Sequence, residues 1–359
     1  MSGIRSVVVG CLAIVVVGMS APAPAVADSI RDRQWHLAVL RIAQAQQLST
    51  GAGVLVAVPD TGVDDRHGEL AGAVVPGKVF GEQAKGDGKA DTDGHGTAMA
   101  GLIAGRGLPN GAGVLGIAPK AMILPVQTVY GGFGGSPVNL ADGIAWATSQ
   151  GAKVICVAAV TSEYPQLRDA IAAAVNADVV VVAGVGNTPK NRQVGFPAKL
   201  PGVVAVAGTD RDGNHAAISA VGPEVVLAAP AVDIVSTGAF GKYETGDGTS
   251  NSTAIVAGVV ALVRAKFPGL SAAEVVHRLT ATATDRGKPG RDEEFGFGIV
   301  DPVAALTAEV PAGGAQVTGV PEAGRERGPT GGGGGVGWVV VAVVAVGGVV
   351  GWWVRRRTR

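Results

Sequence analysis

Cysteine, aromatic residues and charged residues are all scarce in this 359-residue chain. It has two cysteines, 4% aromatic residues and 16% charged residues, and its formal net charge is zero. A chain that is 47% hydrophobic and so weakly charged is neither an intrinsically disordered protein nor a coiled coil. The lack of a basic excess argues against nucleic acid as a partner, because nucleic-acid binding needs a positive field. Glycine is abundant, at 57 residues, but has no third-position period, which excludes collagen.

The two cysteines are not expected to form a disulfide. Cys11 lies in an N-terminal segment with the features of a cleaved leader, and Cys156 lies in the Val-rich run 154–160, typical of a buried strand. No activating neighbour accompanies Cys156 in the sequence, so we expect a small buried hydrophobe rather than a nucleophile. Stability then depends on a hydrophobic core, for which a folded body of about 280 residues is ample.

The N-terminus has the composition of a secretory signal. Residues 1–27 combine Arg5, an apolar run over 7–19 and the small-residue sequence Ala-Val-Ala at 25–27, which predicts a signal peptide cleaved before Asp28. A helix over the apolar run would be about 20 Å long, too short for a bilayer core of about 30 Å. An uncleaved anchor is the alternative interpretation.

The C-terminus has the composition of a membrane anchor. Residues 336–354 contain no charge and would form a helix of about 28 Å, enough to cross a bilayer. Tryptophans lie near both ends of this run, and four arginines follow in residues 355–359. The positive-inside rule therefore predicts a single-pass cell-membrane protein with a cytoplasmic basic tail and an extracytoplasmic body. Residues 309–335, rich in Pro, Gly, Glu and Arg, are expected to be a linker.

Between these ends, apolar runs alternate with helical patterns. Strands are expected in the Val-rich runs 54–58, 154–160, 179–183 and 203–207. Helices are expected over 96–104, 139–149, 166–176 and 249–267, and over 271–281, which opens with capping-box spacing. Strands that alternate with helices predict an α/β domain with a mostly parallel central sheet, helices on both faces and ligands at the carboxyl ends of the strands.

Three polar residues mark the ends of these elements. Asp60 follows a predicted strand, His95 begins a predicted helix, and Ser250 opens another. A serine hydroxyl becomes nucleophilic when a base accepts its proton, and an imidazole can do this near neutral pH. A carboxylate behind the imidazole fixes its tautomer. Each residue alone has a common structural role, as a turn residue, a buried histidine or a helix cap, but together they are candidates for a catalytic triad.

The chain resembles the subtilisin-like serine proteases, peptidase family S8, from about residue 35 to residue 306. The segments 60–62, 95–97 and 248–250 read Asp-Thr-Gly, His-Gly-Thr and Gly-Thr-Ser, and match the three active-site signatures of that family in order and spacing. The resemblance implies a three-layer subtilisin-like fold over 54–308. It also implies that Asp60 orients the base, His95 acts as base and acid, and Ser250 is the nucleophile.

The same resemblance implies the remaining parts of the site. Asn187 would donate its amide to the oxyanion, and an extended peptide would bind against two edge segments. The implied substrate-binding residues are Gly132, Gly134, Gly135, Ser136, Ala158, Ala159 and Val160. No cofactor is implied. Calcium is common in the family, but Asp87, Asp91 and Asp93 form only a weak candidate cluster for a calcium site, and we assign no metal.

The domain plan is similar to that of the mycosins, proteases associated with type VII secretion in actinobacteria. This resemblance implies a protein or peptide substrate and secretion-machinery proteins as partners. Residues 28–53 are too few for the long propeptide usual in secreted subtilisins, so an N-terminal extension packed on the body is expected.

Two departures from the family pattern bear on activity. Val160 stands where the family usually has glycine and is expected to narrow the pocket for the residue before the scissile bond. Ala254 replaces a proline and is expected to loosen the start of the helix that carries Ser250. These departures leave open a second function, a structural component of a secretion complex in which proteolysis is dispensable.

Two other interpretations are not supported by the sequence. A lipase-type α/β-hydrolase is excluded because no Gly-x-Ser-x-Gly motif surrounds Ser250 and the order of the triad would differ. His67 is also followed by glycine, but it occupies the position of a structural turn in the family and is assigned no catalytic role.

Overall fold

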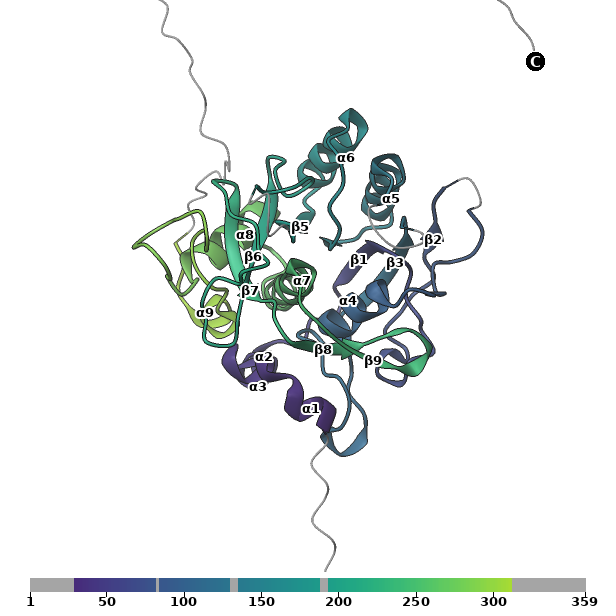
Figure 1. Ribbon diagram of the computed structural model, residues 1–359, viewed down its shortest axis with the longest axis horizontal. Helices are drawn as coiled ribbons and strands as arrows, with labels where there is room; N and C mark the ends of the chain where they lie inside the picture. The colour runs from purple at the N-terminus through teal and green to yellow at the C-terminus, as the bar shows by residue number, and fades with distance from the viewer. Residues whose placement is uncertain (1–28, 82–83, 130–134, 188–192, 312–359) are drawn as a thin grey trace, which may run out of the picture. The chain divides into compact units, whose positions relative to one another are not determined.

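A parallel sheet runs through the middle of the domain in the computed structural model, which describes residues 29–81, 84–129, 135–187 and 193–311 (Figure 1). Within these residues the sheet has seven strands in the order β2-β3-β1-β4-β5-β6-β7, and every pairing is parallel. The strands are β1 (Leu55–Asp60), β2 (Lys78–Val79), β3 (Met122–Gln127), β4 (Val154–Val157), β5 (Val180–Gly184), β6 (Val203–Thr209) and β7 (Val225–Pro230). The expectation of an α/β domain with a mostly parallel sheet is confirmed.

The strand order reverses next to β1. The chain runs from β1 to β2 and β3 on one side of it, and then to β4 and the remaining strands on the other. Such a reversal opens a crevice at the carboxyl ends of the strands, where ligands bind in α/β proteins. Asp60 is the last residue of β1 and pairs with Gln127 of β3, so its side chain is placed at this edge.

Helices cover both faces of the sheet. The helices of the body are α4 (His95–Ala104), α5 (Pro137–Ser149), α6 (Pro165–Asn176), α7 (Thr249–Lys266), α8 (Ala272–Ala281) and α9 (Pro302–Thr307). Helices α5 and α6 pack together on one face, and α4 and α7 lie on the other (Figure 1). Helix α7 is buried along almost its whole length, because it contacts five strands of the sheet as well as α4, α8 and α9. An apolar sequence on every side of a helix is typical of such a central position.

A two-stranded antiparallel hairpin leads the chain into α7. It consists of β8 (Ile234–Thr237) and β9 (Tyr243–Gly246). Strand β8 is fixed to the adjacent helix α4, because the hydroxyls of Ser236 and Thr237 donate to the carbonyl oxygens of Ala98 and Thr97, each at 2.7 Å. The hairpin therefore connects the start of α4 to the start of α7.

Three short helices, α1 (Ser29–Arg33), α2 (Trp35–Val39) and α3 (Ile42–Leu48), precede the sheet and pack on the body (Figure 1). The guanidinium of Arg31 donates to the carbonyl oxygens of Ala112 and Gly113 at 3.1 and 3.0 Å. The Gln34 amide exchanges two hydrogen bonds with the backbone of Leu115, at 2.8 and 3.1 Å. These contacts connect the first helices to the loop over 112–115.

One expectation from the sequence is wrong in detail. Strand β4 ends at Val157 rather than at residue 160, because Thr161 leaves the ladder to form a bridge with Phe196. Helix α7 is continuous from Thr249, and the Ser252 hydroxyl donates to the carbonyl of Ala229 at 2.9 Å, so the loosening of this start by Ala254 stays a prediction.

Several predictions lie outside the described residues. They concern Gly132, Gly134, the signal peptide over 1–27, the transmembrane helix over 336–354, the tail over 355–359 and most of the linker over 309–335. In the part of the chain that the structure describes, no helix is both long enough and apolar enough to span a bilayer.

Candidate active site

The carboxylate of Asp60 lies at the end of β1, and its residue is only 1% exposed. The strand ladder continues through Pro59, which pairs with Val126, so the proline does not end β1 before Asp60. The backbone N–H of Thr61 donates to Asp60 Oδ1 at 2.8 Å. A buried carboxylate needs such partners, because burial without them is costly.

His95 is the first residue of α4, and Asp91 organises the turn before it. The Asp91 carboxylate accepts from the backbone N–H groups of Asp93, Gly94 and Thr97 and from the Thr97 hydroxyl, at 2.6–3.0 Å. These bonds satisfy donors at the helix N-terminus that have no partner within the helix. Asp91 is thus a positioning residue of the site, which the sequence analysis missed.

A close contact between backbones brings α4 against the end of β1. The backbone N–H of Gly96 donates to the Thr61 hydroxyl at 3.0 Å. A side chain on Gly96 would collide with the carbonyl oxygen of Gly62, and its Cβ would lie 3.1 Å from the Cβ of Asp60. Glycine after the histidine is therefore what permits the imidazole to reach the carboxylate.

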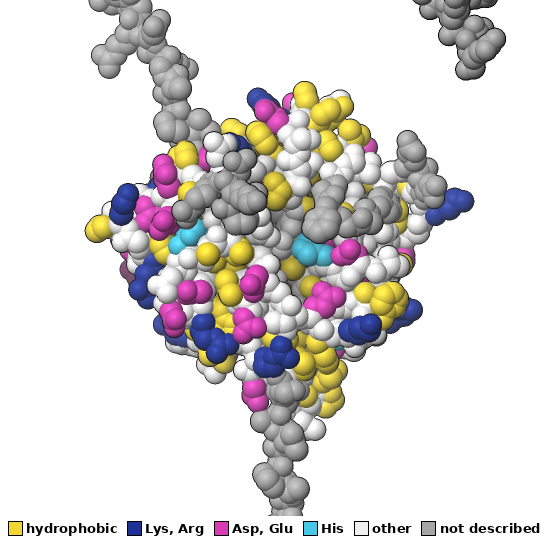
Figure 2. All heavy atoms as spheres, viewed as in Figure 1, with side chains coloured by type: hydrophobic (Ala, Val, Ile, Leu, Met, Phe, Trp, Pro, Cys, Tyr) yellow, Lys and Arg dark blue, Asp and Glu magenta, His cyan; other side chains and the backbone are white. Residues whose placement is uncertain are grey.

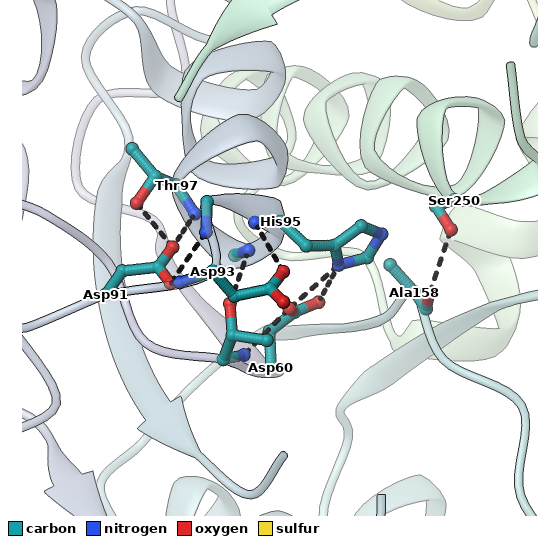
Figure 3. A network of polar contacts seen from close by, with 10 residues as sticks. Asp60, Asp91, Asp93, His95, Thr97, Ala158 and Ser250 are labelled. Carbon is teal, nitrogen blue, oxygen red and sulfur yellow. Dashed lines mark hydrogen bonds and ion pairs between the residues drawn. The ribbon is translucent and has the colours of Figure 1, made fainter. Parts of the chain in front are cut away.

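His95 and Asp60 form a hydrogen-bonded ion pair (Figure 3). His95 Nδ1 lies 2.8 Å from Asp60 Oδ1 and 3.0 Å from Oδ2. Because a carboxylate can only accept, Nδ1 carries the proton, and in the neutral imidazole Nε2 is then the free acceptor. The charge of Asp60 raises the pKa of His95 to about 9 despite burial, and Asp93 and Asp91 add to the effect.

Ser250 is the second residue of α7 and faces the imidazole across the cleft (Figure 3). The ring nitrogen of His95 that does not contact Asp60 is on the side of Ser250. The Ser250 hydroxyl donates to the carbonyl oxygen of Ala158 at 3.0 Å and is not bonded to the imidazole. The three predicted residues therefore meet at one place, with the hydroxyl turned toward Ala158.

Asn187 lies three residues after the end of β5, and Thr249 fixes the orientation of its amide. Asn187 Oδ1 accepts from the backbone N–H of Thr249 at 2.8 Å and from the Thr249 hydroxyl at 2.9 Å. The N–H of Gly186 in turn donates to the Thr249 hydroxyl at 3.2 Å. With its oxygen held, the amide presents Nδ2 on the side of Gly248, 3.2 Å from the position that a Cβ on Gly248 would take. Thr249, unassigned from the sequence although it lies in the motif, thus orients Asn187.

These side chains line one cleft of about 590 Å³. The cleft contains four of the predicted site residues and four of the predicted substrate-binding residues: Asp60, His95, Asn187, Ser250, Gly135, Ala158, Ala159 and Val160. Ser136 is not part of the lining; it caps α5 by accepting from the N–H of Asn139. The lining also includes Val129, Gln193 and Gly195, which the sequence analysis missed, and Asp93, which it considered only for a calcium site.

Acidic side chains surround the histidine. Figure 2 shows acidic groups beside a histidine near the centre of the face viewed. Asp93 lines the cleft, and Glu244 of β9 lies against Gly94, where burial and the charge of Asp91 raise its pKa. Among the described residues no three His, Cys, Asp or Glu side chains are grouped as a metal site, and both oxygens of Asp91 already accept hydrogen bonds.

Two other side chains that could react, those of His67 and Cys156, are buried and have structural roles. His67 is buried, with Nδ1 2.7 Å from Glu69 Oε2 and Nε2 3.0 Å from the carbonyl oxygen of Lys242. It thus connects the loop after β1 to the hairpin. Cys156 is fully buried in β4, and burial raises the pKa of its thiol.

A parallel α/β sheet with a carboxylate, an imidazole and a hydroxyl at its carboxyl edge, in the chain order Asp, His, Ser, is the arrangement of a subtilisin-like serine protease. The subtilase family profile matches residues 51–298. Subtilisin DY from Bacillus licheniformis is 36% identical over 261 residues, which cover 71% of this chain and 91% of subtilisin DY. Mycosin-1 of Mycobacterium tuberculosis is 33% identical over 385 residues, with 89% of this chain and 83% of mycosin-1 covered. The chain belongs to the subtilase family, as a serine protease of the mycosin type.

Solved structures agree with this assignment. The crystal structure of MycP1 without its N-terminal propeptide has a TM-score of 0.69 and 36% sequence identity, covering 78% of this chain and 98% of that one. The MycP3 protease of the type VII (ESX-3) secretion system has a TM-score of 0.67 and 33% identity, covering 77% and 88%. The three-layer fold expected from the sequence is therefore that of known mycosins.

Proposed function

We propose that this protein is a membrane-anchored, extracytoplasmic serine endopeptidase that uses Asp60, His95 and Ser250 as its catalytic triad. The observation that carries the proposal is the position of His95, which is bonded to Asp60 through one ring nitrogen and faces Ser250 with the other. The proposed substrate is a protein or peptide, as in the family to which the chain belongs.

In the proposed reaction the Ser250 hydroxyl turns from Ala158 to Nε2 of His95. The imidazole accepts the hydroxyl proton while Oγ attacks the carbonyl carbon of the scissile peptide. His95 then donates this proton to the leaving amine, which gives an acyl-enzyme, and a water molecule releases the acyl group by the same steps. Asp60 holds the imidazole in the required tautomer and stabilises its charged form.

Asn187 and the backbone N–H of Ser250 are the proposed donors to the oxyanion. Asn187 is suited to this role because Thr249 occupies its oxygen and leaves its N–H groups to face the cleft. A preorganised donor of this kind stabilises the transition state without reorganisation, and its removal typically costs about 10²–10³ in kcat.

Covalent labelling tests the proposed nucleophile. An alkyl fluorophosphonate is expected to label the native full chain, and Ser250→Ala is expected to abolish the labelling. Ser149→Ala, which removes an exposed hydroxyl at the end of α5, is the matched control and should label like the native chain. Labelling that persists in Ser250→Ala would overturn the assignment.

The membrane part of the proposal is supported by the sequence of the chain ends. A signal peptide over 1–27, a linker over 309–335 and an apolar helix over 336–354 would place the body outside the cytoplasm. A MycP1 structure is described as that of an essential component of the type VII (ESX-1) secretion system. We propose, by similarity, that this chain works with secretion-machinery proteins of that kind.

The position of the Ser250 hydroxyl favours a second candidate function. It donates to Ala158 and not to His95, which is compatible with a structural component of the secretion complex whose proteolysis is dispensable. Complementation of a deletion strain distinguishes the two functions: full rescue of secretion by Ser250→Ala supports the structural role, and loss of rescue supports the enzymatic one. Immunoblotting should show that the variant accumulates like the native protein.

A further inference from the structure

Val160 fills part of the cleft that a subtilase with glycine at this position would leave open. Its side chain is 41% exposed and lines the cleft together with the Ser250 side chain. One γ-methyl group of Val160 occupies the space directly over Gly195, so that a Cβ on Gly195 would collide with it. The other γ-methyl lies 3.5 Å from the position that a Cβ on Gly186 would take.

The backbone that follows Val160 is held by hydrogen bonds. The next residue, Thr161, donates through its N–H to the carbonyl of Phe196 at 2.9 Å, and its hydroxyl donates to the carbonyl of Gly135 at 3.0 Å. The opposite wall is held as well, since the N–H of Gly195 donates to the carbonyl of Val185 at 2.9 Å. Among the described residues, the space between these two walls is therefore occupied by the side chain at position 160.

In the proposed reaction, the attacked carbonyl carbon would have to reach Ser250 Oγ while its oxygen reaches Asn187. Both residues line the same cleft as the segment 158–160 and Gly195, so a substrate would lie between the segments 158–160 and 184–187. The side chain on the acyl side of that carbonyl would then extend into the space between Val160 and Gly195, which a γ-methyl group of Val160 already occupies.

We propose that Val160 makes this protease selective for a small side chain, that of glycine, alanine or serine, immediately before the scissile bond. The inference rests on the proposed function of Ser250 and adds the substrate class. A phenylalanine at that position would have to displace the valine methyl groups or the backbone behind them. Because a single methylene in a pocket changes kcat/KM by about 10–200-fold, exclusion of a whole ring should exceed about 100-fold.

The test uses the full chain in detergent and two p-nitroanilides, Ala-Ala-Pro-Ala and Ala-Ala-Pro-Phe. The native chain is expected to cleave the alanine substrate at least about 100-fold better in kcat/KM. Val160→Gly should raise kcat/KM for the phenylalanine substrate at least about 10-fold. Val160→Thr keeps the β-branched shape, so it is the matched control for the size of the side chain and should leave the ratio of the two substrates close to the native ratio.

Fluorophosphonate labelling runs in parallel, because a small alkyl probe reports on Ser250 without filling the pocket. A labelled native chain that cleaves both substrates equally overturns this inference and leaves the proposed function standing. So does a labelled Val160→Gly chain with an unchanged substrate ratio. A chain that neither labels nor cleaves overturns the proposed function and this inference together. Val160→Ala, with an intermediate opening expected, replaces Val160→Gly if the glycine variant melts at a lower temperature than the native chain.

Discussion

The protonation state of His95 determines the pH at which this active site works. His95 must be neutral at Nε2 to accept the serine proton, and the charge of Asp60 raises the pKa of His95 to about 9. Only roughly 1% of the imidazole is then neutral at pH 7. We expect kcat/KM to rise with pH up to about 9, measured on a peptide substrate across pH 6–10.

Asp93→Asn tests the electrostatic origin of that profile. Asp93 is one of the carboxylates that raise the pKa of His95, and it lines the cleft. Removing its charge should move the rising limb of kcat/KM to lower pH and increase the fraction of full activity seen at pH 7. Asp212→Asn, an exposed change outside the cleft, is the control. If kcat/KM of Asp93→Asn rises at the same pH as that of the native chain, the prediction is contradicted.

His36 is expected to make the fold sensitive to acid. Its side chain is fully buried in α2, neither ring nitrogen has a hydrogen-bond partner among the described residues, and burial lowers the pKa of His36 from 6.5 to about 3. Between these values the unfolded chain binds a proton that the folded chain excludes, so stability is present above pH 6.5 and is lost as the pH falls toward 3. The loss should be on the order of a few kcal/mol.

Urea unfolding of His36→Leu measures this contribution. The apolar variant should lose less stability than the native chain between pH 7 and pH 4.5, because it has no imidazole to protonate. Measurement at pH 8 is the internal control, since His36 is neutral there in both the folded and the unfolded state. Equal losses in the two proteins on acidification would show that another group is responsible.

The contact between α4 and β1 determines whether His95 reaches Asp60. Gly96→Ala would place a methyl group against the carbonyl of Gly62 and beside Asp60, which should move the start of α4 outward. Because small displacements of catalytic groups are costly, we expect kcat to fall about 10²-fold or more. The destabilisation should be about 1–3 kcal/mol, as for other overpacked sites.

Gly269→Ala is the matched control for this change. A Cβ at Gly269 would meet no atom of the described residues within 4 Å, so the variant should keep native activity. Activity is measured as kcat on a peptide substrate and stability by urea unfolding. Native kcat in Gly96→Ala would mean that the close approach of α4 to β1 is not what positions the imidazole.

The sequence predicted the ends of β1, α4 and α7 within one or two residues. Val-rich runs, a flanking glycine and an apolar helix are local signals, so they placed Asp60, His95 and Ser250 at the right ends of elements. The early end of β4 had no local signal, because it depends on a bridge between Thr161 and Phe196.

Contacts between distant segments also could not be read from the sequence. The hydrogen bonds from Thr249 to Asn187 join residues that are 62 positions apart, and the bond from Ser250 to Ala158 joins residues that are 92 apart. Val160 was expected to narrow the pocket, but its partner across the cleft, Gly195, was not identified. Such pairs depend on how the strands are ordered in the sheet, which local patterns do not encode.

The attachment of the whole protein to a membrane is the last prediction. We expect attachment to depend on residues 336–354, whose uncharged run is long enough to span a bilayer and is followed by a basic tail. In an actinobacterial host, the full chain should stay in the membrane pellet after alkaline carbonate washing. A chain that ends at residue 311, after α9, should be released into the medium while keeping the fluorophosphonate labelling of Ser250, because every described element of the site precedes that residue.

Replacement of Val343 and Val344 by aspartate in the full chain should also release the protein, since two charges at the centre of a bilayer are costly. Replacement of both valines by leucine is the matched control and should leave the protein in the pellet. Release of the native full chain by carbonate, or retention of the shortened chain in the pellet, would contradict a C-terminal anchor.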